Sequence, residues 1–255
     1  MQNDESMSFA LFKGKDMDSL FYDFHIHSCL SPCGDDEMTP ANLVGMAKVK
    51  GLDVIALTDH NSCRNCPAAM HHGEQYGITV IPGMELNTAE EVHVICLFPD
   101  LPSALSFDAY VYERLFPIKN KEHIFGKQHI LDNNDQTVGC VENLLINATD
   151  ISFDDSFSLV ESFGGVAFPA HIDKESTSLL ANLGFIPPDS IFKSAEIKNK
   201  DELQALQQSH PYLLDCNILF NSDAHYLEDI NEPVHGLPLS SPSIPELLGW
   251  LQTKR

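Results

Sequence analysis

The stretch Leu20-Phe21-Tyr22-Asp23-Phe24-His25-Ile26-His27 is an apolar, β-rich run that ends in two histidines. Residues two apart in an extended strand point to one face, so His25 and His27 form a chelating pair on a single strand. Potential ligands of this kind recur along the chain, mostly within or directly after short apolar runs. The other segments are Asp35-Asp36, Thr58-Asp59-His60, Pro82-Gly83-Met84-Glu85, Val92-His93-Val94, Pro169-Ala170-His171 and Asn221-Ser222-Asp223-Ala224-His225. A barrel that collects its strand ends on one face would bring all of these side chains together.

The rest of the chain alternates between strand and helix patterns. We expect strands at about 20–26, 53–57, 78–81, 92–98, 166–170, 195–197 and 217–221. Helices are expected at about 39–51, 67–76, 154–163, 176–183, 202–208 and 244–251. The first helix has clear boundaries, with Thr39 as N-cap, Pro40 at its first position and Gly51 as its stop. Repeated strand–helix units predict an α/β fold with a mainly parallel sheet.

A single domain of barrel size accounts for most of the 255 residues. Residues 1–19 are interpreted as an N-terminal tail, and residues 20–255 as one barrel domain. The segment at about 99–150 does not fit the alternation and is expected to be a mostly helical insertion. It lies between two potential ligands, His93 and His171, so we expect it on the catalytic face, where it would cap the site.

The charge of the chain bears on its partners. There are 15 basic and 37 acidic residues, which give a net charge of −22. Such a chain repels long polyanions unless bound cations reverse the field locally, so a small phosphorylated substrate fits better than duplex nucleic acid. No run approaches about 20 apolar residues, and the start of the chain lacks a basic and apolar signal pattern. These features predict a cytoplasmic protein without a membrane partner; the sequence gives no indication of the oligomeric state.

Seven cysteines occur, and this odd count argues against a disulfide framework. Four of them fall in the loops after the first two histidine segments: Cys29, Cys33, Cys63 and Cys66. Two close pairs can build an additional zinc or iron–sulfur site, or can pair on oxidation. They can equally be reduced loop thiols, and the spacing does not decide among these alternatives.

Four of the histidine segments together resemble the motifs of the PHP family, named for polymerases and histidinol phosphatases. The matching segments are Asp23-Phe24-His25-Ile26-His27-Ser28, Thr58-Asp59-His60, Ala170-His171 and Ser222-Asp223-Ala224-His225. Glu85 and His93 fall where the family has a bridging glutamate and a further histidine. The resemblance spans Asp23 to His225 and implies a distorted seven-stranded (β/α) barrel, with the insertion between its fourth strand and the later strands. It also implies up to three metal ions at the strand ends.

The resemblance suggests how the ligands are divided. One ion would be held by His25, His27, Glu85 and Asp223, and a second by Glu85, His93 and His171, with Glu85 bridging. The third ion would take His60, His225 and one more residue. For that residue Cys33 has the family's six-residue spacing, whereas Asp35 aligns with an acid that precedes the first helix. We expect Asp35 to be the ligand; Cys33 would make the site softer and more zinc-like.

The function that these features predict is a metal-dependent phosphoesterase using two or three Zn, Mn or Fe ions. Two nearby ions can hold phosphate oxygens and activate a water. Besides Glu85, we expect Asp59 to orient a ligand, and Arg64 and Lys174 to contact phosphate. Substrates would be a phosphomonoester, a nucleotide or a short oligonucleotide. The alternative is a non-catalytic metal or redox sensor that uses the same cage and the cysteine loops.

Overall fold

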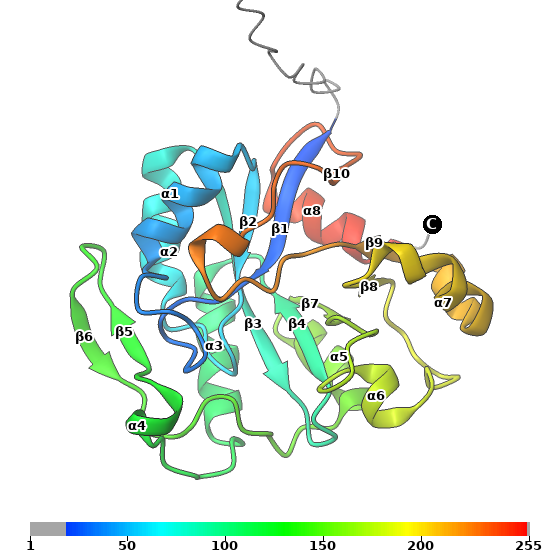
Figure 1. Ribbon diagram of the computed structural model, residues 1–255, viewed down its shortest axis with the longest axis horizontal. Helices are drawn as coiled ribbons and strands as arrows, with labels where there is room; N and C mark the ends of the chain where they lie inside the picture. The colour runs from blue at the N-terminus through cyan, green and yellow to red at the C-terminus, as the bar shows by residue number, and fades with distance from the viewer. Residues whose placement is uncertain (1–18, 254–255) are drawn as a thin grey trace, which may run out of the picture.

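The computed structural model describes residues 19–253, and the predicted tail at 1–19 lies outside this range except for Ser19. Its main sheet has the strand order β10-β1-β2-β3-β4-β7, and two further strands, β8 and β9, pair with each other. The strands are β1 (Leu20–Ile26), β2 (Val54–Leu57), β3 (Thr79–Asn87), β4 (His93–Leu97), β7 (Val166–Pro169), β8 (Ser194–Glu196), β9 (Asn217–Leu219) and β10 (Gly236–Leu237). All seven predicted strands are therefore present. The sheet curls into a half-barrel (Figure 1).

The sheet is mixed, so the prediction of a mainly parallel sheet was wrong in part. β1, β2 and β3 are parallel neighbours, as are β8 and β9. β4 instead runs antiparallel to both β3 and β7. The reason is the short connection at residues 88–92, which is long enough for a hairpin but too short for a crossover helix. As a result, Glu85 and His93 come from two strands of one hairpin.

The α-helices outside residues 99–150 are α1 (Pro40–Lys50), α2 (Cys66–Tyr76), α5 (Phe153–Ser162), α6 (Leu179–Leu183), α7 (Leu203–Ser209) and α8 (Ile244–Leu251). Helices such as α1, α2 and α5 cover the outer face of the sheet, α8 packs on the concave side, and the end of α1 follows the predicted signals. The Thr39 side chain accepts a hydrogen bond from the Asn42 backbone N–H and caps α1, which ends at Gly51 in the left-handed region (φ 83°). Within residues 19–253, no helix is long and apolar enough to cross a membrane.

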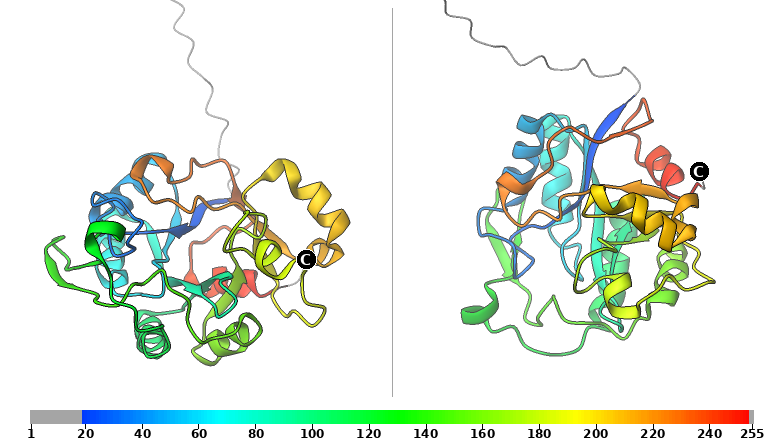
Figure 2. Two further views of the ribbon diagram at one scale, coloured as in Figure 1. Left: turned by 60° about the horizontal axis from the view of Figure 1, so that its bottom comes forward. Right: turned by 45° about the vertical axis from the view of Figure 1, so that its right-hand side comes forward.

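The concave side of the sheet is apolar at one end and polar at the other. Ala56, Ile81, Ile95 and Phe168 are fully buried in one cluster with Leu247 of α8. Side chains alternate between the faces of a strand, so residues further along the same strands continue this face. In β3 the residue four positions after Ile81 is Glu85. The apolar cluster and α8 thus fill one end of the half-barrel and leave the other end to the ligands. The right-hand view of Figure 2 shows α8 near the start of β1.

The segment at 99–150, which the sequence predicts to be an insertion, is less helical than expected. It starts with α3 (Leu101–Tyr112) and a short α4 (Glu122–Phe125), and continues as a hairpin of β5 (His129–Leu131) and β6 (Thr137–Cys140). The hairpin packs beside the loop that follows β1, where the His129 N–H donates to the Cys29 carbonyl at 3.2 Å. Asn65 also binds this strand through its side chain. The insertion therefore supports the loop that carries Cys29 and Cys33.

Candidate metal centre

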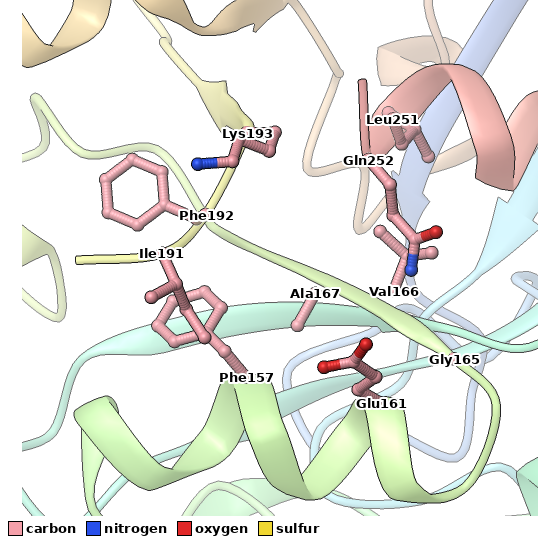
Figure 3. A pocket seen from close by; sticks show the side chains of 10 residues that line it. All are labelled: Phe157, Glu161, Gly165, Val166, Ala167, Ile191, Phe192, Lys193, Leu251 and Gln252. Carbon is pink, nitrogen blue, oxygen red and sulfur yellow. The ribbon is translucent and has the colours of Figure 1, made fainter. Parts of the chain in front are cut away.

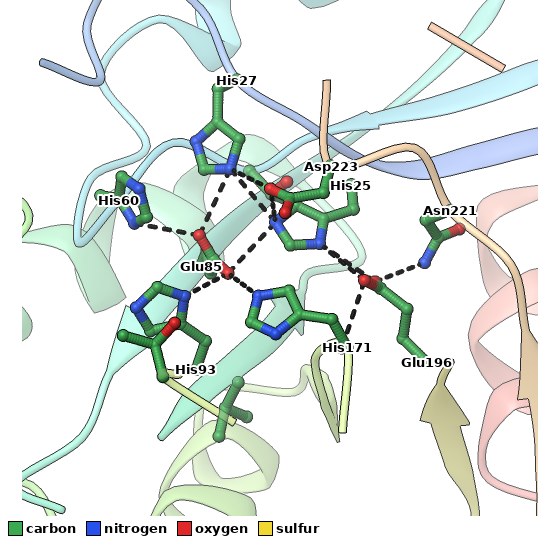
Figure 4. A network of polar contacts seen from close by, with 12 residues as sticks. His25, His27, His60, Glu85, His93, His171, Glu196, Asn221 and Asp223 are labelled. Carbon is green, nitrogen blue, oxygen red and sulfur yellow. Dashed lines mark hydrogen bonds and ion pairs between the residues drawn. The ribbon is translucent and has the colours of Figure 1, made fainter. Parts of the chain in front are cut away.

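The carboxylate of Glu85 lies at the centre of the site and is fully buried. Five histidine rings surround it (Figure 4). The distances from ring nitrogen to Glu85 oxygen are 2.7 Å for His93, 2.9 Å for His60, 3.1 Å for His171, 3.2 Å for His25 and 3.3 Å for His27. The ligands come from β1, β3, β4 and the segments after β2 and β7, so the curl of the sheet is what assembles them.

Four of these side chains, here called the deep group, form a cage: His25, His27, Glu85 and Asp223. The Nε2 atoms of His25 and His27 are 3.1 Å apart and lie 3.3 and 3.4 Å from Oδ1 of Asp223. A tetrahedron with corners about 2.0–2.2 Å from its centre has edges of about 3.3–3.6 Å, which suits zinc ligands. The donor types and their separations therefore fit a divalent cation.

A second feature of the cage also fits a cation. Oε2 of Glu85 and Nδ1 of His60 are only 2.9 Å apart, yet neither atom has a hydrogen-bond partner. Buried polar groups are rarely left unsatisfied, because that costs about 1–3 kcal/mol each. Two donor atoms that approach without a hydrogen bond between them are placed as ligands of one ion would be. Glu85, His60 and His93 form a recognisable ligand group of their own.

Glu196, which the sequence analysis overlooked, supports His25 from behind. Its carboxylate is fully buried at the end of β8 and lies 3.0 Å and 3.1 Å from Nδ1 of His25. It also accepts hydrogen bonds from the His171 backbone N–H and the Asn221 side chain. A proton on Nδ1 leaves the Nε2 lone pair of His25 free for a metal. The sequence did offer a signal for Glu196, because it is an acidic residue at the end of a short strand, as Glu85 is.

Asp59 lies behind His27, with the hydroxyl of Ser31 between the two side chains. The Ser31 hydroxyl donates to Oδ1 of Asp59 at 2.7 Å and lies 2.9 Å from Nδ1 of His27. Asp59 also accepts from the backbone and hydroxyl of Ser28. Because Ser31 gives its proton to Asp59, it accepts the proton of His27 Nδ1, and Nε2 of His27 is again left for a metal.

A third group of side chains lies nearer the surface. His27, His60 and His225 have ligand atoms within 4.8 Å of one another. Nε2 of His225 is 3.0 Å from Sγ of Cys33, and its Nδ1 faces the Asp223 carbonyl at 2.9 Å. The structure does not bring the Asp35 carboxylate to this group: that carboxylate accepts a hydrogen bond from the Glu37 backbone N–H at 2.9 Å. We call His60, His225 and Cys33 the rim group.

The carboxylates and histidines of the site shift each other's pKa values. Burial opposes the protonation of His25, but the carboxylates of Glu196, Glu85 and Asp223 raise its pKa well above the usual value. Burial likewise opposes the ionisation of Glu85, yet the charges of His93, His25 and His60 hold its pKa well below its usual value. His25 and His60, whose pKa values are raised, thus carry positive charge where bound cations would otherwise supply it, whereas burial lowers the pKa of His93 to about 4.

The thiol of Cys33 has an unusual pKa. Burial alone would raise it, but the charge of His60 and hydrogen bonds from His225 and His60 lower it to about 5. The residue is exposed at the rim of the site, and its sulfur lies 3.0 Å from Nε2 of His225. At neutral pH the sulfur is therefore a thiolate, the form that binds metals.

Two ligands sit on strained backbone. His171 has φ 27° and Asp223 has φ 56°, both in the left-handed region that non-glycine residues rarely occupy. Asn61, directly after His60, has φ 47°. Such conformations cost about 1–3 kcal/mol each and persist where the surroundings over-determine them, often at functional sites. Strained backbone thus occurs at or beside three ligands, although Glu91, Asp135 and Thr177 also have positive φ.

The two basic residues expected to contact phosphate lie in different places. Nζ of Lys174 is 2.9 Å from Oδ2 of Asp223, at the edge of the deep group. Arg64 is turned away from the histidines: its Nε binds Asp108 of α3 at 3.1 Å, and its guanidinium stacks 4.5 Å over the ring of Tyr112. The structure therefore brings Lys174, but not Arg64, to the cluster.

The four loop cysteines do not form one site. Among residues 19–253, the groups of possible metal ligands include no set of cysteines. Cys63 and Cys66 are buried, with their sulfurs 3.1 and 3.6 Å from the Gly83 carbonyl, and Cys29 is buried as well. Burial raises the pKa of Cys63 well above its usual value and that of Cys29 to about 12. Buried, protonated thiols of this kind are core side chains.

Two hollows lie near the ends of the strands. One of about 460 Å³ borders Asp223 and is lined by Lys198, Lys200, Phe220 and His235, among others. The other, of about 420 Å³, lies at the start of β7, at the opposite end of that strand from His171. Figure 3 shows its lining of Phe157, Ile191 and other side chains, which include none of the predicted ligands. The first hollow is therefore the one placed to serve the metal cluster.

Comparison with known proteins places the chain in a family. The PHP domain matches residues 23–180. The uncharacterized protein MJ1587 of Methanocaldococcus jannaschii is 34% identical over 93 residues, covering 33% of this chain and 54% of that protein. The 5'-3' exoribonuclease Rnm of Salmonella typhimurium is 32% identical over 103 residues, covering 38% of this chain and 34% of the enzyme. The alignments thus reach about half or less of the length of these relatives.

A solved structure shares the fold. The lesion-specific endonuclease PfuEndoQ of Pyrococcus furiosus superposes with a TM-score of 0.64 at 16% identity, over 92% of this chain and 56% of that one. Together with the domain match, this confirms both the fold expected from the motifs and the family resemblance. The chain belongs to the PHP domain family.

Proposed function

We propose that the chain is a metal-dependent hydrolase that cleaves phosphoester bonds with a multinuclear centre at the half-barrel end. The observation that carries this proposal is the Glu85 carboxylate within 3.3 Å of five histidine nitrogens. Family membership supports it, and so do the names of the relatives, which include exoribonucleases and a lesion-specific endonuclease.

The residues would hold the ions as follows. The deep group would hold one ion, and Glu85, His93 and His171 a second, with Glu85 shared. Zinc, manganese and iron all accept imidazole and carboxylate donors. Bound divalent ions supply charge neutralisation for the phosphate oxygens and an acidified water as nucleophile. Glu196 and Asp59 fix the rings of His25 and His27, so the donors are positioned before the ions arrive.

Lys174 would act on the substrate side of the centre. Its ammonium neutralises Asp223 in this structure and is 37% exposed, so it can reach an incoming phosphate without a large rearrangement. Arg64 is committed to Asp108 and Tyr112, which leaves Lys174 as the basic residue that meets the site.

The hollow beside Asp223 favours a nucleotide or short oligonucleotide over a simple phosphomonoester. Phe220 offers a ring on which a base can stack, and His235 lies against it with ring centroids 4.8 Å apart. Nζ of Lys200 is 5.7 Å from the centre of the Phe220 ring. Aromatic platforms next to basic side chains are typical of binding to single-stranded nucleic acid. With a net charge of −22, long duplexes are disfavoured.

The sensor alternative loses its main support in this arrangement. It uses the same cage and the cysteine loops, and three of the four loop cysteines are buried, with no cysteine among the possible metal-ligand groups of residues 19–253. The ligand set of the proposed hydrolase, by contrast, is gathered at one point.

The proposal is tested by metal reconstitution followed by a substrate panel. Protein loaded with Mn²⁺ or Zn²⁺ is incubated with p-nitrophenyl phosphate, nucleoside monophosphates and bisphosphates, and 5'-phosphorylated RNA and DNA oligonucleotides. We expect phosphate or nucleotide release that disappears on chelation and returns with metal. Phe220→Ala should raise KM about fivefold or more for nucleotides but not for p-nitrophenyl phosphate, because one stacked base contributes about 1–3 kcal/mol. No release from any substrate by protein that binds its ions would refute the proposal.

A further inference from the structure

The rim group contains a side chain with different chemistry from the rest of the centre. His60 and His225 supply nitrogen donors, as do the histidines of the deep group, but Cys33 supplies sulfur. His27 also lies close to both rings. Its Nε2, however, is part of the deep group, and its Nδ1 is bound to Ser31. The donors that remain for a separate ion at the rim are therefore His60, His225 and Cys33.

The contact between Cys33 and His225 is direct. Sγ lies 3.0 Å from Nε2 of His225. The other nitrogen of that ring donates to the Asp223 carbonyl at 2.9 Å, so Nε2, which donates to the sulfur in the metal-free protein, is the nitrogen that a metal would take. The His60 ring approaches the same thiol. Its Nδ1 faces Oε2 of Glu85 at 2.9 Å, so its Nε2 is the nitrogen left for the rim. These atoms meet at one point from three separate loops.

The loop after β1 is built to present the sulfur. The Gly34 N–H donates to the Ser31 carbonyl at 2.9 Å and closes a tight turn around Pro32 and Cys33. A Cβ on Gly34 would lie 2.4 Å from the Ser28 carbonyl oxygen, so the turn requires glycine. The Asp35 N–H then donates to the His225 carbonyl at 3.0 Å, which ties the loop to the segment that carries His225.

The same turn keeps the Asp35 carboxylate away from the rim group. Its backbone is fixed to His225, and its carboxylate accepts from the Glu37 N–H at 2.9 Å, just before the start of α1. An aspartate that accepts from the backbone two residues on is a common turn element. Asp35 thus stabilises the loop, while Cys33 points at the histidines.

We propose that Cys33, with His60 and His225, forms a mixed thiolate–histidine site that selects zinc at the rim of the centre. This rests on the proposed metal-dependent function. A thiolate favours zinc over manganese, and hard carboxylate sites do not discriminate in this way. The centre would then hold chemically different ions: zinc at the rim, and an ion of the N/O type in the deep group.

The test uses cobalt as a spectroscopic substitute for zinc. Chelator-treated full-length protein is reconstituted with Co²⁺, and its near-ultraviolet spectrum and metal content are measured. We expect a thiolate-to-cobalt charge-transfer band in the wild type. Cys33→Ser should lose the band and one equivalent of metal. Cys33→Asp, which restores a hard ligand, should lose the band but keep the metal. Asp35→Ala and Cys140→Ser, the latter at the other exposed cysteine, should keep both.

The outcomes separate this inference from the proposed function. A band that survives in Cys33→Ser, or an equivalent lost in Asp35→Ala but kept in Cys33→Ser, would overturn the rim site. Hydrolysis is measured on the same samples with Mn²⁺ or Zn²⁺. If the wild type shows the band but no hydrolysis, the hydrolase proposal fails and the rim site stands.

Discussion

The deep group and the rim group lie side by side but differ in how they are held. His25, His27 and Glu85 have fully buried side chains, whereas His225 is 23% exposed and Cys33 is exposed. Each histidine of the deep group has a carboxylate behind it, directly for His25 and through Ser31 for His27. His225 is supported by a backbone carbonyl instead.

If both groups bind ions as proposed, this difference predicts that the deep ion is held firmly and the rim ion exchanges more readily. Carboxylate support and burial fix the deep donors before any ion binds, and they make substitution there costly. The rim has one soft donor, weaker support and access to solvent, so an ion there can exchange without opening the core. Substitutions in the deep group should therefore reduce metal affinity and hydrolysis more than substitutions at the rim.

Glu85→Gln is expected to have the largest effect. The substitution keeps the shape of the side chain but removes the charge that the five histidines share. Hydrolysis should fall by more than about 100-fold, the upper range for residues that merely support a ligand. Steady-state kinetics and metal content measure this. Glu142→Gln, an exposed acid paired with Lys119, is the matched control and should change neither. Near-normal activity of Glu85→Gln would remove the shared carboxylate from the centre.

Glu196→Gln should come next, since it acts on the deep group only through His25. The amide can still accept from Nδ1 of His25, but the negative charge behind the ring is lost. We expect metal affinity or activity to fall about 10–100-fold. Competition with a chromophoric chelator measures the affinity. The Co²⁺–thiolate band of the rim should be unchanged; if that band is lost while the deep site keeps its ion, the separation of the two groups is wrong.

Lys174→Met probes the boundary between protein and substrate. Lys174 is more than one-third exposed, so losing its ion pair with Asp223 should change the free energy of unfolding by less than about 1 kcal/mol. A charged hydrogen bond to phosphate is worth more, and kcat/KM should fall about tenfold. Thermal unfolding and kinetics on one sample distinguish the two. A large loss of stability with unchanged kinetics would make Lys174 a structural residue.

The smallest change is expected in the alkylation of Cys33 in metal-free protein. A thiol reacts as thiolate, and the pKa of Cys33 is lowered to about 5. Thiolate is therefore present above pH 5 and is lost as the pH falls through that value. Between pH 8 and 6 the rate with iodoacetamide should change less than about twofold, whereas free cysteine, with a pKa of about 8.5, slows about tenfold per unit. Mass spectrometry follows the reaction. A rate that tracks free cysteine would show that the rim histidines do not act on the sulfur.

Much of the fold was predictable because short apolar runs and capping signals are local. All seven strands and the boundaries of α1 follow from such patterns. The antiparallel course of β4 was not predicted, because the alternation of strands and helices gives no sign of direction; only the short connection at 88–92 does. The hairpin in the insertion was missed for a similar reason, since its strands are three and four residues long.

The site was predictable where ligands come in pairs along a strand, as with His25 and His27. Glu196 was missed because a single acidic residue at the end of a three-residue strand cannot be told from the many other acidic residues of the sequence. The choice between Asp35 and Cys33 could not be made from spacing, because it depends on a turn that closes around Gly34 and on a backbone contact with His225. Contacts of this kind join residues almost 200 positions apart.

The contact between β1 and the segment after β9 has a consequence for when the site can form during synthesis of the chain. The Phe24 N–H binds the Asn221 side chain at a separation of 197 residues, whereas Glu85 and His93 are joined within one hairpin. Contacts of high sequence separation bear the largest loop-closure cost and form late in folding. The β3–β4 pair can therefore exist on a growing polypeptide, but the cage with Asp223 cannot. If the deep group holds an ion as proposed, we expect tight binding only after synthesis has passed Asp223, and a chain that ends before β9 should bind the ion weakly.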